Sequence, residues 1–337
     1  MHILVTGHTG FKGSWFSLLA KEQGHRVSGI SLSPELNSIF ERCELESIFE
    51  YSTYEDIRDR KRLNNFVKKV QPDALIHLAA QPIVRKSYSN PLDTFETNVM
   101  GTWNVLQEVT ESTSIKASLF ITTDKVYLNE NSGKHFKEMD PLGAADPYST
   151  SKAAADLLVQ SWKKCYSEKL ISIARAGNVI GGGDIGENRL IPDILRALES
   201  KTSLRVRYPN STRPWQHVLD CVNGYLGLLE KSYVEKIDGV WNFGPLESDE
   251  KSVENVVKIF LNNLGSDLAI EYDISNSREE AVRLMLNSEK AVAELDWRRK
   301  FSSDDAIKWT AEFYLQVERG ETYLNAMRDQ VVKFRSL

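Results

Sequence analysis

A glycine-rich turn directly behind the first apolar run is the feature that most constrains how this chain can fold. Residues 2–13 read HILVTGHTGFKG, and the residues that follow, up to Gly24, carry apolar side chains at helical spacing. A strand, a tight turn and a helix in this order are typical of the first unit of a parallel sheet with covering helices. Gly7 permits the turn, and Gly13 lets the helix pack closely on the strand. The sequence therefore predicts that the chain begins as an α/β fold.

The same alternation continues through the first half of the chain. Apolar runs that predict strands lie at residues 25–31, 73–80, 117–123 and 170–181, and helical patterns lie at residues 59–70, 91–112 and 147–167. Strands that alternate with helices in this way form a doubly wound parallel sheet of the Rossmann type. After about Asn178 the alternation loosens. We therefore expect an α/β fold with a smaller second domain that is interleaved with the first.

Composition and charge narrow the classes of function. The 337 residues are 41% hydrophobic and 26% charged, which suffices for one large or two modest domains. A net charge of -5, a pI near 5.8 and the lack of a Lys/Arg-rich tract argue against nucleic acid or an anionic membrane as a partner. Three widely separated cysteines suggest neither a disulfide framework nor a zinc site. With no signal-peptide pattern and no long apolar run, we expect a cytoplasmic protein that binds small molecules and no metal.

The glycine turn also carries the first chemical signal. Because a helix begins at the turn, its first backbone amides can bind the pyrophosphate of a dinucleotide, and Gly10 lets the backbone approach it. The ribose end of such a ligand would lie near Ser33, where the second strand ends. No Arg or Lys occurs between Ser28 and Glu35, which favours NAD over a cofactor with a 2′-phosphate. Asp56, in the segment DIRD, is a candidate contact of the adenine edge, with a solvated turn as the alternative.

A tyrosine and a lysine four residues apart give the second signal. Tyr148 and Lys152 fall on one face of the helix predicted at residues 147–167. An ammonium beside a phenol stabilises the phenolate and lowers its pKa, so Tyr148 is a candidate base toward a substrate hydroxyl. The pair alone is also compatible with a chance surface arrangement. Behind a dinucleotide turn it resembles the short-chain dehydrogenase/reductase superfamily, and the long second domain resembles the extended branch of sugar-nucleotide enzymes.

The segment ITTDKVY, at the end of the strand predicted at residues 117–123, separates chemistries within that branch. Sugar-nucleotide 4-epimerases carry small or hydroxyl-bearing residues there, whereas this chain has Thr123 followed by Asp124 and Lys125. The resemblance to 4,6-dehydratases implies that Asp124 protonates the departing C6 hydroxyl and that Thr123 hydrogen-bonds the C4 oxygen. Lys125 stands where most of these enzymes have a glutamate base, and it would have to be neutral to take the C5 proton. The alternative is a pair of surface charges beyond a strand.

Longer motifs resemble the CDP-glucose 4,6-dehydratases over about residues 1–245. They include GHTGFKGSW, LAAQPIVRKSY, TTDKVY, DPYSTSKAAADLL, ARAGNVIGGGD, RLIPDILRA and RPWQHVL. The resemblance implies tightly bound NAD that is recycled in each turnover, and the conversion of CDP-glucose to CDP-4-keto-6-deoxyglucose. It also implies that residues 1–177 and 213–243 form the NAD-binding domain, and that residues 178–212 and 244–337 form the sugar-nucleotide-binding domain.

The same resemblance assigns site residues position by position. The catalytic residues would be Thr123, Asp124, Lys125, Tyr148 and Lys152. The residues expected to contact NAD are Gly7, Thr9, Gly10, Phe11, Lys12, Gly13, Ser33, Asp56, Ile57, Leu78, Ala79, Ala80, Gln81, Asn98, Thr122, Tyr148 and Lys152. Those expected to contact the substrate are Gln81, Arg85, Asn178, Arg189, Leu190, Arg213, Trp215 and Arg278. Trp215 could instead pack in the core.

Two predicted helices, Pro91–Ser112 and Tyr148–Tyr166, carry apolar residues on more than one face. The resemblance implies that such helices pair across a two-fold axis into a four-helix bundle, so we expect a homodimer, with packing inside the monomer as the alternative. Rival functions are a 4-epimerase or a dehydratase of another sugar nucleotide, and a non-catalytic protein that binds NAD or a sugar nucleotide. A binding protein would have no need of the acid, the base and the tyrosine–lysine pair together.

Overall fold

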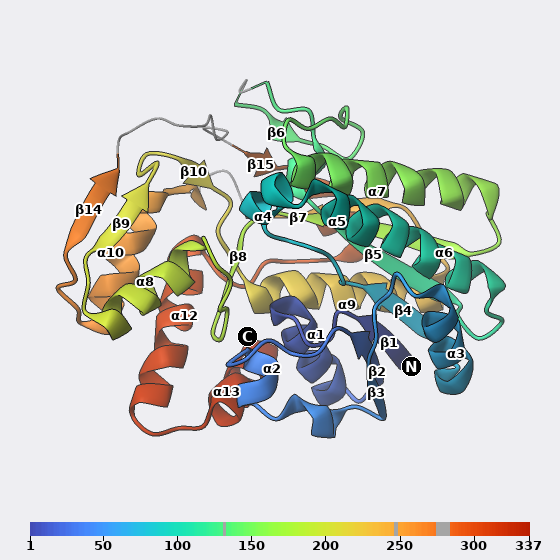
Figure 1. The fold of residues 1–337 in the computed structure, drawn as a ribbon, viewed down its shortest axis with the longest axis horizontal. Coiled ribbons are helices and arrows are strands. Elements are labelled where there is room, and N and C mark those ends of the chain that lie inside the picture. Colours follow the sequence, from blue (N-terminus) through green and yellow to red (C-terminus); the bar gives the residue numbers. More distant parts are fainter. Residues whose placement is uncertain (131–132, 246–248, 274–283) are drawn as a thin grey trace.

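A seven-stranded parallel sheet forms the centre of the computed structural model (Figure 1). The strand order is β12-β7-β5-β4-β1-β2-β3, and every neighbouring pair is parallel. The order reverses between β1 and β4, which makes the sheet doubly wound and confirms the predicted fold class. The structure describes residues 1–130, 133–245, 249–273 and 284–337. The strands of this sheet are β1 (His2–Thr6), β2 (Arg26–Ser31), β3 (Tyr51–Tyr54), β4 (Ala74–His77), β5 (Ala117–Thr123), β7 (Leu170–Ala176) and β12 (Val240–Phe243).

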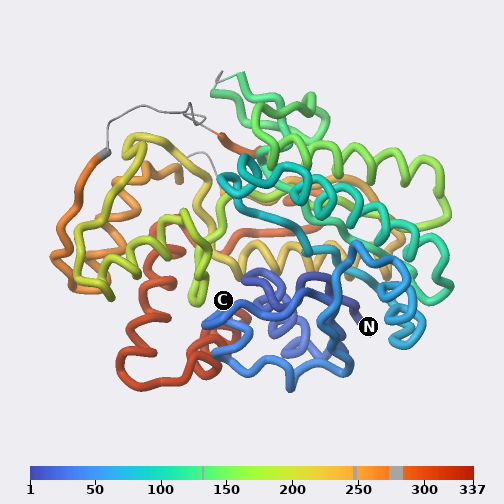
Figure 2. Tube along the Cα trace, viewed as in Figure 1, coloured from blue at the N-terminus to red at the C-terminus, as the bar shows by residue number. Residues whose placement is uncertain are grey.

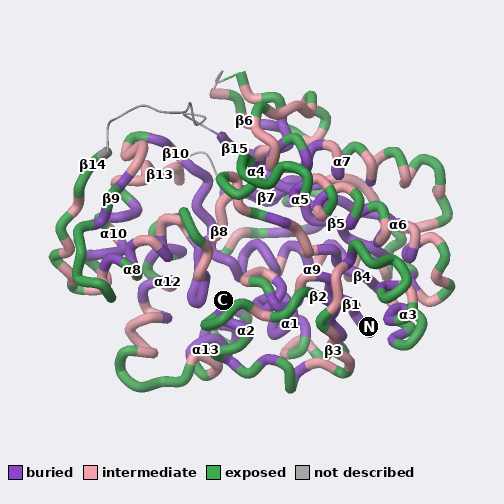
Figure 3. Tube along the Cα trace, viewed as in Figure 1, coloured by how far each residue is buried: buried purple, intermediate pink, exposed green. Residues whose placement is uncertain are grey.

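Alternate residues of the strands face two separate cores, because successive side chains of a strand point to opposite faces. Ile3 and Ile121 lie in a core with the helices of one face, whereas Leu4 and Phe120 lie in a core with the helices of the other. The first face is covered by α1 (Phe11–Glu22) and α9 (Val218–Glu235), and the second by α3 (Arg60–Val70), α6 (Gly101–Glu111) and α7 (Pro147–Cys165). The central strands are therefore buried on both sides (Figure 3).

A smaller unit with its own core lies on the left in Figure 1. Its strands β9 (Leu204–Arg207) and β14 (Ile270–Asp273) pair in parallel, and its helices α8 (Leu190–Ser200), α10 (Val253–Leu264) and α12 (Ser303–Glu318) pack around residues such as Ile194 and Phe260. The remaining elements include α2 (Ile39–Arg42), α4 (Val84–Ser89), β6 (His135–Phe136), β8 (Val179–Ile180), β10 (Thr212–Arg213), β11 (Gln216–His217), β13 (Lys251–Ser252), β15 (Met285–Leu286), α11 (Glu289–Leu295) and α13 (Tyr323–Ser336). Within the described ranges, no helix combines the length and the apolarity that a bilayer crossing requires.

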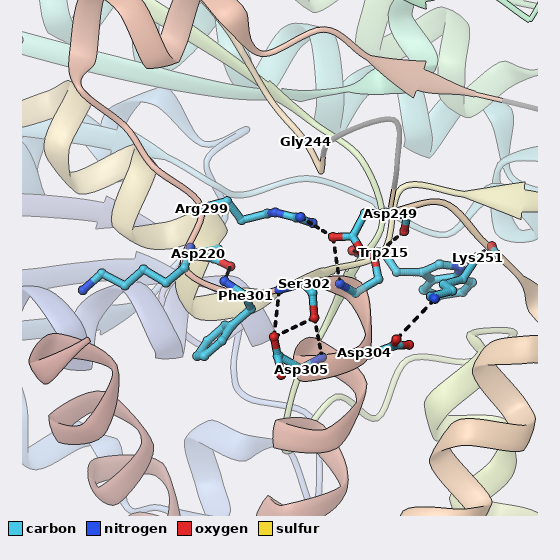
Figure 4. A network of polar contacts seen from close by, with 12 residues as sticks. Trp215, Asp220, Gly244, Asp249, Lys251, Arg299, Phe301, Ser302, Asp304 and Asp305 are labelled. Atoms are coloured by element: carbon cyan, nitrogen blue, oxygen red, sulfur yellow. Dashed lines mark hydrogen bonds and ion pairs between the residues drawn. The ribbon is translucent and has the colours of Figure 1, made fainter.

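The segment that precedes α12 ties the two units together (Figure 4). Asp220 of α9 accepts hydrogen bonds from the backbone N–H groups of Lys300 (2.8 Å) and Phe301 (3.1 Å), and burial raises the pKa of its carboxyl to about 6. One residue earlier, Arg299 pairs with Asp249. After α12 the chain returns to the N-terminal half, where α13 packs on α1 and α2 (Figure 2). The end of the chain therefore contacts both units.

The helix predicted at residues 91–112 is interrupted in the structure. Its parts, α5 (Pro91–Phe95) and α6, are joined by a π-helical turn, η2 (Glu96–Met100). The turn brings Asn98 to the backbone of Gln81, where Oδ1 accepts from the amide (2.8 Å) and Nδ2 donates to the carbonyl (3.1 Å). The buried side chain of Asn98 thereby fixes the chain behind β4. The strand β3 was not predicted, because its four residues are polar or aromatic and only partly buried.

Candidate active site

The carboxyl end of β5 carries the acid and the base expected from the sequence. Asp124 and Lys125 lie in a 3₁₀ turn, η3 (Asp124–Val126), that begins directly behind Thr123. The Thr123 hydroxyl donates to Asp124 Oδ1 (2.8 Å) and accepts from the backbone N–H of Lys125 (3.3 Å). Thr123 is therefore the cap of the turn and holds both neighbours at the edge of the sheet. This edge is where ligands bind in open α/β sheets.

Asp124 sits in a dry environment. Its side chain is 2% exposed, and its Oδ2 has no hydrogen-bond partner among the described residues. A Cβ atom on Gly177 would lie 2.9 Å from that oxygen, so the glycine is what leaves room for the carboxyl. Burial raises the pKa of Asp124, whereas Lys125, the Thr123 hydrogen bond, Arg213 and Lys12 oppose the rise. The carboxyl is therefore suited to hold a proton and to donate it.

The tyrosine and the lysine of the predicted pair lie at the start of α7. Asp146 caps this helix by accepting from the Ser149 N–H (2.9 Å), and the backbone N–H of Tyr148 donates to Ser87 Oγ (3.1 Å). One turn later, Lys152 Nζ donates to the carbonyl of Ile121 in β5 (2.8 Å). This bond holds the first turns of α7 against the strand that carries the acid. The structure thus brings the four side chains predicted at positions 124, 125, 148 and 152 to two adjoining elements.

The pKa of Tyr148 differs in direction from the prediction. Burial, and next the charge of Asp124, raise the pKa of the phenol to about 12, with a hydrogen bond from Thr123 opposing the rise. The ammonium of Lys152 is directed to the carbonyl of Ile121. Burial, and next the cation of Lys12, lower the pKa of Lys152 to about 8. Lys12, which is predicted to contact NAD, therefore also acts on Lys152 and Asp124 through its charge.

The glycine turn has the shape that a dinucleotide requires. Gly7 has a φ of +77°, and a Cβ atom there would lie 2.6 Å from the backbone N of Ala79. A Cβ atom on Gly13 would lie 2.1 Å from the carbonyl oxygen of Gly7. Gly10 is the N-cap of α1 and leaves the first turn of the helix without a side-chain cap or an acidic residue. The amides of Phe11 and its neighbours are therefore available to a pyrophosphate, and the residues present fit a dinucleotide.

The side chains of the other residues expected to contact a dinucleotide differ in what they bind and in how far they are buried. Thr9 hydrogen-bonds Ser31 (2.7 Å), and the backbone N–H groups of Leu78 and Ala79 bond to Thr6. Asp56 is ion-paired with Arg58 (2.7 Å). Ser33 is exposed, Ala80 is partly buried, Ile57 is buried, and the Thr122 hydroxyl donates to Asp156 (2.9 Å). Thr122 and Ile57 thus face the protein interior.

The expected substrate contacts are spread over several elements of both units. Arg213 is buried, and its charge acts on Asp124. Arg189, directly before Leu190 at the start of α8, is ion-paired with Asp184 (2.9 Å). Asn178 is partly buried, and its carbonyl accepts from Gln216 (3.2 Å). Trp215 is a core side chain whose indole donates to the carbonyl of Lys251 (3.1 Å), and Arg278 lies outside the described residues.

A polar cavity of about 540 Å³ brings the predicted Arg85 together with residues that the sequence did not reveal. Arg85 of α4 lines it together with Arg196 of α8 and with Arg205 and Arg207 of β9, whereas Asp193 is the one acidic residue among the described residues that line it. A surplus of three positive charges suits an anionic ligand. The signal was present in the segment LRVR at residues 204–207, where arginines alternate with the buried Leu204 and Val206 of a strand. The sequence could not show that these two arginines share a cavity with Arg196, because that depends on where β9 lies relative to α8.

The sheet, the glycine turn and the helix of Tyr148 place the chain in the extended branch of the short-chain dehydrogenase/reductase superfamily. Residues 4–310 match the family described as GDP-mannose 4,6 dehydratase, and the chain belongs to that family. The match covers both structural units.

Comparison with individual proteins shows which enzymes this chain resembles. A CDP-glucose 4,6-dehydratase of Salmonella typhimurium is 39% identical over 345 aligned residues, which cover 99% of this chain and 96% of the relative. A dTDP-glucose 4,6-dehydratase of Bacillus anthracis, solved in complex with NAD, is 26% identical with a TM-score of 0.78 and covers 96% of this chain and 99% of that one. A UDP-glucose 4-epimerase of Stenotrophomonas maltophila, at 20% identity and a TM-score of 0.83 over 95% and 100% of the two chains, shares the fold. The predicted resemblance to CDP-glucose 4,6-dehydratases is confirmed.

Proposed function

We propose that this protein is an NAD-dependent 4,6-dehydratase that converts CDP-glucose to CDP-4-keto-6-deoxyglucose and water. The observation that carries the proposal is the buried Asp124, whose protonated form is favoured by burial, next to Lys125 and Thr123 at the end of β5. A 4-epimerase has no use for an acid that protonates a leaving hydroxyl. The 39% identity to a CDP-glucose 4,6-dehydratase over nearly the whole chain supports this choice of reaction and nucleotide.

The reaction assigns one task to each side chain. NAD would supply the hydride acceptor that C4 oxidation needs and the hydride donor that C6 needs. Tyr148 would take the proton of the C4 hydroxyl, and Thr123 would hydrogen-bond the C4 oxygen. Lys125 would remove the C5 proton, which the C4 ketone makes acidic, and would return a proton to C5 when C6 receives the hydride. Asp124 would give its proton to the C6 hydroxyl, so that the C6–O bond breaks and water leaves.

NAD and the sugar nucleotide would bind to different parts of the chain. We infer that residues 1–177 and 213–243 bind NAD, with the pyrophosphate on the amides at the start of α1. Residues 178–212 and 244–337 would bind the sugar nucleotide. Arg207 of the polar cavity supports this division, because it has no hydrogen-bond or ion-pair partner among the described residues and would donate to phosphate oxygens, whereas Arg85 would reach the same ligand from residues 1–177. Asn178 and Arg213 would lie on the sugar side of that cavity.

We further infer a homodimer through a four-helix bundle. The helices α5, η2, α6 and α7 expose large apolar side chains, among them Leu92 (72%), Met100 (52%) and Leu157 (54%). Trp103 packs edge-on against Trp162 with ring centroids 4.7 Å apart, so the two helices already form half of such a bundle. A second copy would cover these side chains across a two-fold axis. The three cysteines are free thiols, which favours the reducing conditions of the cytoplasm.

The test of the proposed function is mass spectrometry of the purified protein with CDP-, dTDP-, UDP- and GDP-glucose, without added cofactor and then with NAD. The expected result is loss of one water from CDP-glucose, with the other nucleotides slower or unchanged. Loss of water from a different nucleotide alone would refute the assignment of the base. A product of unchanged mass whose C6 hydroxyl is retained would point to a 4-epimerase and refute the dehydratase.

A further inference from the structure

A row of polar side chains crosses three strands just below the proposed active site. In the register of the sheet, Arg175 of β7 lies beside Thr122 of β5 on one side and Asn242 of β12 on the other. Side chains at paired positions of neighbouring strands share a face, so all three project toward α7 and the chain that follows η3. Both of these segments cover this face (Figure 1). The row is fully buried or nearly so, and none of the three residues has been given a catalytic task.

One half of the row connects to the helix that carries Tyr148 and Lys152. Asp156 of α7, one turn beyond Lys152, accepts from Arg175 Nη2 (2.7 Å) and Nε (2.8 Å), and both side chains are 0% exposed. The Thr122 hydroxyl donates to the same carboxylate (2.9 Å). A two-pronged bond between a guanidinium and a carboxylate fixes both distance and orientation. It therefore sets the position of α7 on β5 and β7.

The other half of the row connects to the turn that carries Asp124 and Lys125. Arg175 Nη1 donates to the hydroxyl oxygen of Tyr127 (2.8 Å), and the guanidinium lies 4.9 Å from the centre of the tyrosine ring. The Tyr127 hydroxyl in turn donates to Asn242 Oδ1 (2.7 Å). Its ring stacks on Phe136 with centroids 4.9 Å apart. Tyr127, two positions after Lys125, is thus held through both its hydroxyl and its ring.

The turn also has anchors of its own. Its internal bonds are the 2.8 Å bond from the Thr123 hydroxyl to Asp124, the 3.3 Å contact from the Lys125 N–H to Thr123 and the 3.4 Å contact from the Tyr127 N–H to the carbonyl of Asp124, and the Gly143 N–H donates to the carbonyl of Val126 (2.9 Å). Lys125 is half-buried and makes no side-chain hydrogen bond or ion pair with a described residue. The place of its side chain is therefore determined by where the backbone of the turn is held, and Tyr127 is the anchor that connects the turn to Arg175 of β7 and Asn242 of β12.

We propose that Arg175 and Tyr127 are positioning residues, which fix the turn of Asp124 and Lys125 at the correct distance from the Tyr148 helix for removal of the C5 proton. The inference rests on the proposed function, because it assigns a purpose to the distance between the two catalytic segments. A buried ion pair contributes little net stability compared with apolar residues of the same volume. Its geometric link between two catalytic segments is the role that the position in the fold supports.

The test compares Tyr127→Phe with the wild type, using CDP-glucose that carries deuterium at C5. The variant keeps the ring and its stacking on Phe136 but loses the bonds to Arg175 and Asn242. We expect kcat to fall by about 10- to 100-fold while KM stays within about twofold, since a shift of about 1 Å in a reacting group has such an effect. The deuterium isotope effect on kcat should rise above that of the wild type, because C5 proton removal becomes slower than the other steps.

A matched control separates positioning from stability. Tyr314→Phe also removes the hydroxyl of a partly buried tyrosine, which accepts a hydrogen bond from the backbone of Gly183 (2.9 Å) in another part of the fold. It should lower the melting temperature without changing the isotope effect. If Tyr127→Phe lowers the melting temperature but leaves kcat and the isotope effect at wild-type values, the residue is structural and the inference is wrong.

A second variant keeps the inference testable if the first folds poorly. Arg175→Lys retains a positive charge opposite Asp156 but replaces the planar fork by a single ammonium, which cannot hold Asp156 and Tyr127 at once in the same geometry. It should show the same rise in the isotope effect at C5. An unchanged isotope effect in this variant would overturn the inference while the wild type still removes water. A wild type that removes no water would instead refute the proposed function itself.

Discussion

Replacing Asp124 by asparagine should separate the chemistry of the site from its stability. The amide of the Asp124→Asn variant would keep an oxygen that accepts from the Thr123 hydroxyl and has nearly the same volume, but it cannot donate a carboxylic proton. General acid catalysis contributes about 10²- to 10⁴-fold, so the rate of water loss should fall by that factor, or about 3–5 kcal/mol in the barrier. The free energy of unfolding should change by no more than about 1 kcal/mol, since the hydrogen bond from Thr123 is kept.

The sign of the stability change depends on pH. Burial raises the pKa of Asp124 above its usual 3.8. Between the usual and the raised pKa the folded state binds more protons than the unfolded state, so this carboxyl makes the wild type less stable as the pH rises. The amide of the variant does not titrate. Asp124→Asn should therefore gain stability relative to the wild type toward neutral pH, and thermal melts at pH 4 and pH 7 measure the difference.

The assay for the chemistry uses CDP-glucose in D₂O. C4 oxidation followed by proton removal at C5 introduces deuterium at C5 even when water cannot leave, so mass spectrometry follows exchange and water loss separately. Asp124→Asn should retain the exchange and lose the elimination. Asp220→Asn is the control, because Asp220 is also a buried carboxyl with a raised pKa but holds only the backbone of Lys300 and Phe301. A variant at Asp124 that eliminates water at the wild-type rate, or that loses exchange and elimination equally, would refute the role of Asp124 as the acid.

Three further outcomes are expected. Gly13→Ala would place a Cβ atom 2.1 Å from the carbonyl oxygen of Gly7, so the purified variant should contain little NAD. The NAD released when the purified variant is denatured measures this, and an amount equal to that of the wild type would contradict the prediction. Arg207→Met should raise KM for CDP-glucose at least about tenfold and leave kcat within about twofold of the wild type. Arg298 is exposed and lies outside the cavity, so Arg298→Met should change neither value. Equal KM values for the wild type and Arg207→Met would show that Arg207 does not bind the substrate. Burial lowers the pKa of His77 and of His217 to about 3. As the pH falls below 6.5, these histidines take up protons in the unfolded state before they do so in the folded state. The free energy of unfolding should therefore be unaffected by them above about pH 6.5 and should decrease below it by up to about 1.4 kcal/mol per pH unit for each histidine. His217→Gln should flatten the fall of the melting temperature between pH 6.5 and 5, and an identical slope in the variant would contradict the assignment.

The fold and the two local catalytic motifs were readable from the sequence because each depends on short-range patterns. The glycine turn behind β1 and the spacing of Tyr148 and Lys152 are fixed by local backbone geometry, and both lie on the elements predicted for them. The position of Asp124 directly behind a buried strand predicted that it would lie at the edge of the sheet. The family and the fold class are therefore confirmed, whereas the individual roles of these residues remain predictions.

Features that depend on contacts between distant segments could not be read in the same way. The π-helical turn of Asn98 interrupts a regular helical pattern because its side chain bonds to the backbone of Gln81. The raised pKa of Tyr148 follows from burial, which no spacing of residues reveals. The link from Arg175 to Tyr127 and the arginines of the polar cavity join segments that lie far apart along the chain. Such contacts exist only after the sheet has assembled.

The proposed dehydratase reaction is tested most directly with CDP-glucose that carries deuterium at C4, incubated with the wild-type protein in ordinary water. A 4,6-dehydratase moves the hydrogen of C4 to C6 within one molecule, so we expect a product that has lost one water and carries the deuterium in its C6 methyl group. A product that retains its C6 hydroxyl, or that has lost water but also lost the deuterium to solvent, would refute the proposed reaction.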